Sequence, residues 1–331
     1  QFTKITNGQF LTPLEIIEFL VKIVNPRGDD LVCDPCLGSA DFLSLSYRLS
    51  EPKLSDTNLY GIDLDEKMVA LGQLNMILNG DGNSHLIRVG GEGSILNKIT
   101  KKGDVVPLVH NLHAYDETSK IADWDNWKDG TELKKFDVVL TNPPFGKGRT
   151  FEAKTEEDRK ILDMYETFHI KNKPPSLDKG IIFLENAYHI LDNHGRLGIV
   201  ISNAIASEDS TEEIREWLLK KMRIVAIFDL PPNVFAETGV NTTLIIAYKD
   251  SEENIKKLKD KDYSVFTRNI TKVGYIKKTK KRNVVFEPDY KIDPTSYDIM
   301  IDSDGNPILN EDFSSIISEF KDWAKTQEDI L

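Results

Sequence analysis

The chain has 331 residues, of which 40% are hydrophobic and 29% are charged, as is typical of a soluble globular protein. No apolar run approaches the roughly 18–20 residues that a membrane span needs. Two cysteines are too few for a disulfide framework, so we expect a cytoplasmic protein without a membrane partner. The formal net charge of −12 argues mildly against a nucleic-acid partner, although local basic stretches count for more than the total.

Apolar runs that predict buried strands alternate with helical patterns along the chain. The first predicted helix begins at Thr12-Pro13-Leu14-Glu15, where Thr12 heads a capping box and Pro13 takes the first helical position. Helices are predicted over 13–24, 65–80, 178–191 and 210–222, and the second has Met68, Leu71, Leu74, Asn75 and Leu78 at helical spacing. Strands are predicted over 30–34, 58–63, 136–142, 195–202, 224–230 and 242–249.

This alternation is typical of a mainly parallel sheet covered by helices on both faces, with binding residues at the carboxyl ends of its strands. Two polar stretches, 97–135 and 147–177, interrupt it and are predicted to be insertions beside the sheet. We expect residues 1–250 to form one α/β domain. Residues 251–331 are then a C-terminal extension that packs on, or continues, the same domain.

The segment DPCLGSAD (34–41) lies between the first strand and a helix. Pro35 forces Asp34 into an extended conformation, and Gly38 and Ser39 let the backbone pass close to a ligand at the helix N-terminus. Neither G-x-G-x-x-G nor G-x-x-x-x-G-K-[ST] occurs, so a dinucleotide or a triphosphate is poorly supported. A carboxylate at the strand end repels phosphate and suits a cation, such as the ammonium of an amino acid.

A second acid, Asp63, ends the next predicted strand, 29 residues after Asp34. An acid at the tip of the second strand typically accepts hydrogen bonds from ribose hydroxyls. Either aspartate alone is equally well explained as a helix cap or a turn former. Together, at successive strand ends, they favour a ligand with an ammonium, a ribose and no phosphate, which describes S-adenosylmethionine.

The thiols of Cys33 and Cys36 form a single C-x-x-C, and no second pair completes a zinc site. We therefore predict that this spacing is coincidental and that no metal is bound.

The tetrapeptide Asn142-Pro143-Pro144-Phe145 follows a buried strand directly. Its prolines fix the backbone and remove two donors, which leaves the Pro143 carbonyl and the Asn142 side-chain oxygen as rigid acceptors. Paired acceptors suit an exocyclic amino group, because they hold both hydrogens and stabilise the positive charge that grows on nitrogen during methyl transfer. Phe145 offers a face on which a base can stack. For so short a motif, the alternative is a turn that merely ends the strand.

Basic residues at two places are candidates for contact with DNA phosphates. Lys147 and Arg149 lie in GKGR (146–149), close to the tetrapeptide, and Lys277 and Lys278 lie in IKKTKKR (276–282). For the second stretch a solvated hairpin or loop is slightly favoured.

Taken in their order, these segments resemble the amino-group-specific adenine DNA methyltransferases. More narrowly, the chain resembles the modification (M) subunit of type I restriction–modification systems. The resemblance is carried by GQFLTP (8–13), DPCLGSADFL (34–43), NPPFG (142–146) and DLPPNVFAETGVNTTLIIAYK (229–249).

The resemblance implies a Rossmann-like S-adenosylmethionine-dependent methyltransferase with a mainly parallel seven-stranded sheet. It implies that Asn142, Pro143, Pro144 and Phe145 act on the target amine. Cofactor binding is implied for Phe10, Thr12, Pro13, Asp34, Pro35, Gly38, Ser39, Asp63, Leu64 and Asn142. The loop departs from the family pattern at Leu37, where cysteine is usual, and at Ala40, where a second glycine is usual, so a lower cofactor affinity is expected.

The implied function is methylation of the N6 amino group of adenine in DNA. A separate specificity subunit would read the DNA sequence, and the resemblance also allows for a restriction subunit as a further partner. Two alternatives stay open: a methyltransferase for an RNA amino group or a protein glutamine amide, and a catalytically impaired scaffold subunit that binds the cofactor.

Overall fold

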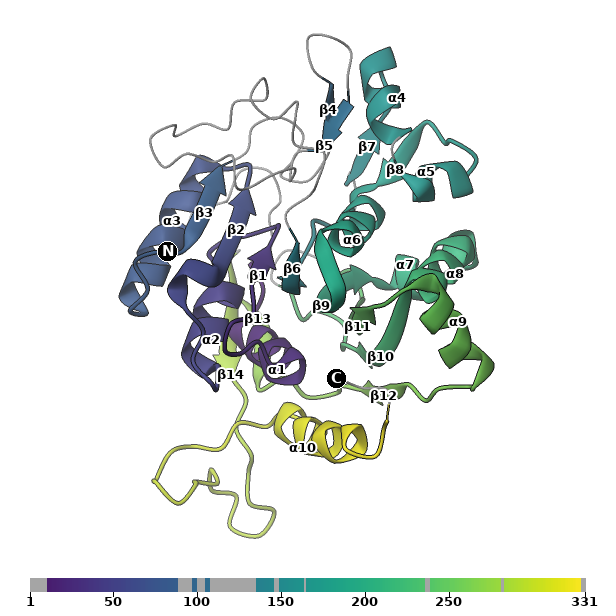
Figure 1. The fold of residues 1–331 in the computed structure, drawn as a ribbon. Coiled ribbons are helices and arrows are strands. Elements are labelled where there is room, and N and C mark those ends of the chain that lie inside the picture. The colour runs from purple at the N-terminus through teal and green to yellow at the C-terminus, as the bar shows by residue number, and fades with distance from the viewer. Residues whose placement is uncertain are drawn as a thin grey trace.

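The computed structural model describes residues 11–88, 97–99, 105–107, 135–145, 149–163, 165–235, 239–280 and 283–328. Its central feature is an eight-stranded sheet in the order β12-β10-β11-β9-β6-β1-β2-β3 (Figure 1). These strands are β1 (Val32–Asp34), β2 (Leu59–Asp63), β3 (His85–Arg88), β6 (Phe136–Thr141), β9 (Leu191–Ser202), β10 (Met222–Asp229), β11 (Thr242–Lys249) and β12 (Phe266–Asn269).

The predicted mainly parallel sheet is confirmed. Only the two pairings of β11, with β9 and with β10, are antiparallel. The predicted number of seven strands is wrong, because β12 adds an eighth strand by pairing in parallel with β10. The sequence pattern does not reveal β12, since in Phe266-Thr267-Arg268-Asn269 only Phe266 is buried.

Helices cover both faces of the sheet, as predicted. One face packs on α1 (Leu14–Val24), α2 (Asp41–Leu49), α3 (Glu66–Leu78) and α10 (Phe313–Ala324). The other face packs on α5 (Glu166–Ile170), α6 (Lys179–Ile190) and α8 (Glu212–Lys221). The inner strands β6 and β11 are buried almost throughout, which explains their near-continuous apolar sequences.

Shorter elements complete the described chain. They are the helices α4 (Glu156–Leu162), α7 (Asn203–Ser207) and α9 (Glu252–Asp260), the 3-10 turns Asp56–Asn58 and Asp209–Thr211, and the paired strands β4 (Asn97–Ile99) with β5 (Val105–Pro107) and β7 (Thr150–Glu152) with β8 (Ser176–Asp178). The predicted insertion at 147–177 therefore has secondary structure of its own, whereas most of 97–135 lies outside the described residues.

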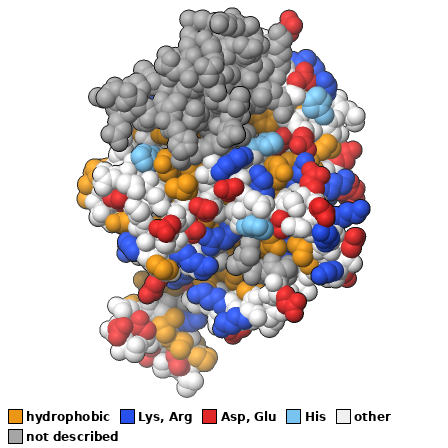
Figure 2. All heavy atoms as spheres, in the orientation of Figure 1, with side chains coloured by type: hydrophobic (Ala, Val, Ile, Leu, Met, Phe, Trp, Pro, Cys, Tyr) orange, Lys and Arg blue, Asp and Glu red, His pale blue; other side chains and the backbone are white. Residues whose placement is uncertain are grey.

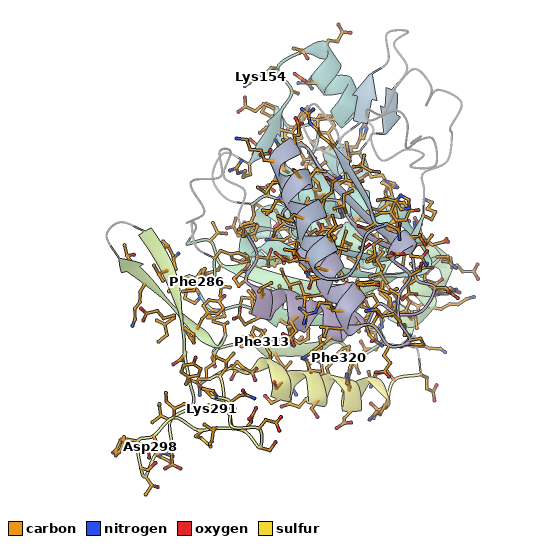
Figure 3. All side chains as sticks on the ribbon, turned by 90° about the vertical axis from the view of Figure 1, so that its left-hand side faces the viewer. Lys154, Phe286, Lys291, Asp298, Phe313 and Phe320 are labelled. Carbon is orange, nitrogen blue, oxygen red and sulfur yellow. The ribbon has the colours of Figure 1, made fainter. Side chains whose placement is uncertain are left out.

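Some of the residues after Lys249 join the central sheet and its helices, and others extend away from them. β12 joins the sheet, and α10 packs against α1, with the rings of Phe313 and Phe19 5.0 Å apart. Between them, the hairpin of β13 (Tyr275–Lys280) and β14 (Asn283–Pro288) and the following arm, residues 289–311, extend outward (Figure 3). In the part of the chain that the structure describes, no helix has the length and apolar character needed to cross a membrane.

The strand order reverses at β1. From β1 the chain continues to β2 and β3 on one side, whereas β6 and β9 lie on the other. Val32 pairs with Val138 and Cys33 with Val139, so the carboxyl ends of β1 and β6 lie side by side. In open α/β sheets, ligands bind at such a switch point, outside the carboxyl ends of the strands. Asp34 and Asn142 are the residues found there.

Candidate active site

The loop after β1 is held against β2 by backbone hydrogen bonds. Asp34 is 1% exposed, and its Oδ1 accepts the Cys36 N–H at 3.0 Å, which turns the chain sharply at Pro35. The Leu37 N–H donates to the Ile62 carbonyl at 3.0 Å, and the Gly38 N–H donates to Asp63 Oδ2 at 3.0 Å. The two strand ends and the loop between them therefore form one connected structure.

Asp63 braces the loop through its side chain, which agrees with the turn-forming role considered as an alternative from the sequence. In addition to Gly38, its other oxygen, Oδ1, accepts the Asp65 N–H at 2.8 Å. Each oxygen of this carboxylate accepts one backbone N–H, and the predicted bonds from ribose hydroxyls stay a prediction. The next residue, Leu64, is 38% exposed at the edge of the same loop cluster.

The loop takes two left-handed backbone conformations, at Gly38 with φ of 51° and at Ala40 with φ of 64°. Glycine adopts this conformation freely, whereas for alanine it costs roughly 1–2 kcal/mol. This explains why a glycine is usual at the position of Ala40. Leu37 is 3% exposed and packs in the space that Gly61 and Gly72 leave open. The departure at Leu37 is thus accommodated by two glycines on neighbouring elements.

Asn75 on α3 ties down the second half of the loop. Its Nδ2 donates to the Ser39 carbonyl at 2.7 Å and to Asp41 Oδ1 at 2.9 Å. The Ser39 hydroxyl in turn donates to the Asp41 carboxylate. Asp41 therefore organises the start of α2.

The carboxyl of Asp34 lies in an environment that disfavours its charge. Burial, together with the nearby charges of Asp63 and Asp41, raises its pKa to about 7. The Cys36 N–H and the nearby Thr141 hydroxyl, which lies outside hydrogen-bonding geometry, act in the opposite direction. Burial also raises the pKa of the Cys36 thiol, and the Asp34 charge adds to this effect. A cation placed beside Asp34 would therefore be strongly favoured.

Thr12 contacts the tetrapeptide instead of capping a helix. The predicted capping box is wrong: α1 begins at Leu14, its N-cap is Pro13, and no side chain caps it. The Thr12 Oγ1 accepts the Asn142 Nδ2–H at 2.8 Å, across 130 residues of sequence. This bond fixes the orientation of the amide, so that its oxygen is the atom left for another partner.

Phe145 is 2% exposed and lies edge-on against Phe235, with ring centroids 5.1 Å apart and planes at 73°. Phe235 is 1% exposed and belongs to the loop between β10 and β11. The ring predicted for base stacking is thus buried and in contact with a second aromatic ring. Phe235 was missed as a site residue, although it lies within the segment 229–249 that carries part of the family resemblance.

Three buried polar atoms at the ends of β1 and β6 have no hydrogen-bond partner within the described part of the chain. They are Asp34 Oδ2, Thr141 Oγ1 and Asn142 Oδ1. Buried polar atoms are nearly always hydrogen-bonded, and each exception calls for an explanation. Three exceptions on adjacent strand ends indicate a place where a polar ligand completes the structure. Thr141, which is fully buried, is a second site residue that sequence reasoning missed.

The three predicted basic residues that the structure describes make different contacts. Lys277 Nζ donates to the Phe235 carbonyl at 2.7 Å, and Lys278 pairs with Glu287 at 2.6 Å. Arg149 precedes β7, where its carbonyl accepts the Lys179 N–H at 2.8 Å. Acidic and basic side chains are interspersed over the face seen in Figure 2. Lys147 and Phe10 lie outside the described residues.

Both cysteines are free thiols. Among the described residues, no group of three or more histidine, cysteine, aspartate or glutamate side chains is arranged to hold a metal ion.

Comparison with known proteins agrees with this geometry. The chain is 26% identical over 256 residues to the methylase subunit of the type I restriction enzyme StySPI of Salmonella potsdam. The aligned region covers 76% of this chain and 42% of that subunit. It is 22% identical to the methylase subunit of the type I enzyme MpnII of Mycoplasma pneumoniae, over 98% of this chain and 60% of the subunit. The chain thus spans roughly half the length of these relatives.

Among solved structures, the type I restriction–modification methyltransferase subunit of Streptococcus thermophilus matches 98% of this chain and 54% of its own, with a TM-score of 0.55 and 19% identity. A Listeria monocytogenes protein assigned to the class I S-adenosylmethionine-dependent methyltransferases matches 82% of this chain and 69% of its own, with a TM-score of 0.54 and 15% identity. These likenesses show the class I methyltransferase fold. The family model of the N-6 DNA methylases matches residues 1–297, and with that match over most of its length the chain belongs to the N-6 DNA methylase family.

Proposed function

We propose that this protein methylates the N6 amino group of adenine in DNA, as the modification subunit of a type I-like restriction–modification system or a related defence system. The observation that carries the proposal is the set of three unpartnered buried atoms, Asp34 Oδ2, Thr141 Oγ1 and Asn142 Oδ1, at the switch point of the sheet. Support also comes from the family and from the relatives, which are methylase subunits of type I restriction enzymes.

The residues at the switch point fit S-adenosylmethionine. Asp34 is a buried acid with a raised pKa and an unpartnered oxygen, so it suits the ammonium of the methionine part. Gly38 and Ser39 bring the backbone to the same place at the start of α2. In this proposal Thr12, Pro13, Pro35 and Leu64 border the cofactor. When bound, it would supply a sulfonium methyl to the amine nitrogen, with the sulfur keeping the electron pair of the broken sulfur–carbon bond and the amine giving one proton to solvent water.

The tetrapeptide holds the target amine in this proposal. Asn142 Oδ1 and the Pro143 carbonyl accept its two hydrogens, which leaves the nitrogen lone pair free for attack. As positive charge develops on nitrogen, both oxygens stabilise it without reorganising, because Pro143 and Pro144 fix the backbone and Thr12 fixes the amide. Phe145 borders the base, which must leave the duplex stack to reach this point.

Sequence recognition is assigned to a separate specificity subunit, with a restriction subunit as a further member of the assembly. The two type I methylase subunits named above are each about twice as long as the region that matches this chain. Lys147 and Arg149 are proposed to contact phosphate beside the target base.

Transfer of labelled methyl groups from S-adenosylmethionine to DNA, with and without a specificity subunit, tests the proposal. The expected product is N6-methyladenine. Asn142→Ala should abolish transfer and leave cofactor binding, measured by calorimetry, intact. Labelling of RNA or of a glutamine amide in place of DNA would overturn the assigned substrate. Tight cofactor binding with no methyl transfer to DNA, RNA or a glutamine amide would instead indicate a catalytically impaired scaffold subunit.

A further inference from the structure

The loop that joins β10 to β11 carries Phe235 and lacks regular secondary structure in its described residues. Buried backbone carbonyls in such a loop need partners from other elements. Two consecutive carbonyls find theirs on β13. The Tyr275 hydroxyl donates to the Val234 carbonyl at 3.0 Å, and Lys277 Nζ donates to the Phe235 carbonyl at 2.7 Å. The C-terminal hairpin thus grips this loop at two adjacent points.

Both gripping side chains lie on the same face of β13, because alternate residues of a strand share a face. On this face Phe286, which is opposite Lys277, packs edge-on against the Tyr275 ring with centroids 4.9 Å apart. The opposite face is turned to solvent: Ile276 is 45% exposed, and Lys278 pairs there with Glu287 of β14. Neighbouring lysines of one strand therefore have different surroundings.

The grip reaches the tetrapeptide in one further contact. Lys277 donates to the backbone carbonyl of Phe235, and the ring of the same residue lies 5.1 Å from the ring of Phe145. Val234 and Phe235 are 3% and 1% exposed, so the gripped segment is part of the core. Loosening it would allow Phe235 to move against Phe145.

We propose that the β13–β14 hairpin is a clamp on the target-base side of the site, and that Tyr275 and Lys277 are positioning residues that act through Phe235 on Phe145. This inference rests on the proposed function, in which Asn142 to Phe145 hold the target amine. It gives the residues after 250 a part in the reaction. It also assigns Lys277 to a backbone carbonyl, where the sequence suggested a DNA phosphate.

Hydrogen exchange in the full chain without DNA tests the grip itself. Lys277→Met keeps the aliphatic stem and removes the ammonium, and Tyr275→Phe removes only the hydroxyl. Each should speed exchange of the amides of Asn233, Val234 and Phe235 by about tenfold, the effect of losing one hydrogen bond. Lys278→Met, one residue away on the outer face, should leave that exchange as in the wild type. Equal exchange in Lys277→Met and Lys278→Met would overturn the clamp.

Methyl transfer at saturating DNA and S-adenosylmethionine tests the positioning role. Lys277→Met should lower kcat by about tenfold, with cofactor affinity and the salt dependence of DNA binding unchanged. A phosphate contact would instead reduce the slope of log affinity against log salt by about one, at constant kcat. That result would overturn the inference. If the wild type methylates no DNA while Lys277→Met still loosens the loop, the proposed function fails and the clamp stands.

Discussion

Asp34 is a carboxylic acid placed where its charge is disfavoured. It lies at the end of a buried strand, with one oxygen on the Cys36 N–H and the other unpartnered within the described part of the chain. Thr141 and Asn142 end the neighbouring strand with similarly unpartnered oxygens. Each is unfavourable for stability in the free protein, since a buried acceptor without a donor loses its hydration. Ligands that donate hydrogens to these oxygens would recover that loss on binding.

The raised pKa of Asp34 makes cofactor affinity depend on pH. In the free protein the pKa is about 7, and a neighbouring ammonium would favour the charged carboxylate. Below pH 7, binding therefore has to release a proton. Affinity for S-adenosylmethionine should fall by up to about tenfold per pH unit from pH 7 to pH 5. Calorimetry in two buffers of different ionisation enthalpy measures both the affinity and the proton released.

Asp34→Asn is the control, because it keeps the shape and removes the titration. It should bind the cofactor more weakly at pH 7.5 and with no proton release. It should also raise the free energy of unfolding at pH 8 more than at pH 4. The sign follows from linkage: between about pH 4 and pH 7 the folded protein keeps a proton that the unfolded chain has lost, so wild-type stability falls as pH rises. A wild-type affinity that is constant from pH 5 to pH 7 would contradict this assignment.

At the scale of elements, the loop after β1 packs between β2 and α3, and each of these two elements has a glycine where it contacts the loop. Leu37 fills the space above Gly61 of β2 and Gly72 of α3. A Cβ on Gly72 would lie 3.1 Å from the Ala40 Cβ, so α3 approaches the loop as closely as a glycine permits. The cofactor loop of this protein thus depends on residues of two other elements.

Gly61→Ala should therefore destabilise the protein. The added Cβ would overlap Leu37 Cδ1 and lie 3.0 Å from Leu86 Cδ2. Overpacking of this kind costs about 1–3 kcal/mol of unfolding free energy, which urea denaturation measures. Gly82→Ala is the matched control, since a Cβ there meets nothing within 4 Å. In a Leu37→Ala background, Gly61→Ala should cost less than it does in the wild type, and equal effects of the two glycine variants would refute the packing argument.

The helix α3 also shows where sequence patterns stop being sufficient. Of the residues predicted at helical spacing, Met68 is buried, but Leu74 and Leu78 are 53% and 76% exposed. The helix turns Gly72 toward the loop instead, because only a residue without a side chain fits there. Strand ends and the position of the tetrapeptide were predictable, since local hydrophobicity sets them. The Thr12–Asn142 bond was not, because its partners meet only in the folded chain.

At the scale of the whole molecule, the C-terminal residues pack on the side of the sheet that carries α1. The Phe313 ring lies 5.0 Å from Phe19 of α1, and the Phe320 ring lies 5.5 Å from Phe266 of β12 (Figure 3). These rings belong to the same hydrophobic cluster as the core beneath α1 and α2. The chain therefore returns from the hairpin and arm to close one face of the sheet.

Phe320→Ala should accordingly destabilise the whole body and not only the C-terminal helix. Its ring is 7% exposed, and truncation of a buried phenylalanine costs about 3–5 kcal/mol. We expect a single urea transition at a lower midpoint, with circular dichroism and tryptophan fluorescence coinciding, because the extension and the sheet share one core. Ile301→Ala, on the arm and 62% exposed, should leave the midpoint nearly unchanged. Two separate transitions in Phe320→Ala would show that α10 unfolds by itself, and that the extension is stabilised independently of the sheet that it covers.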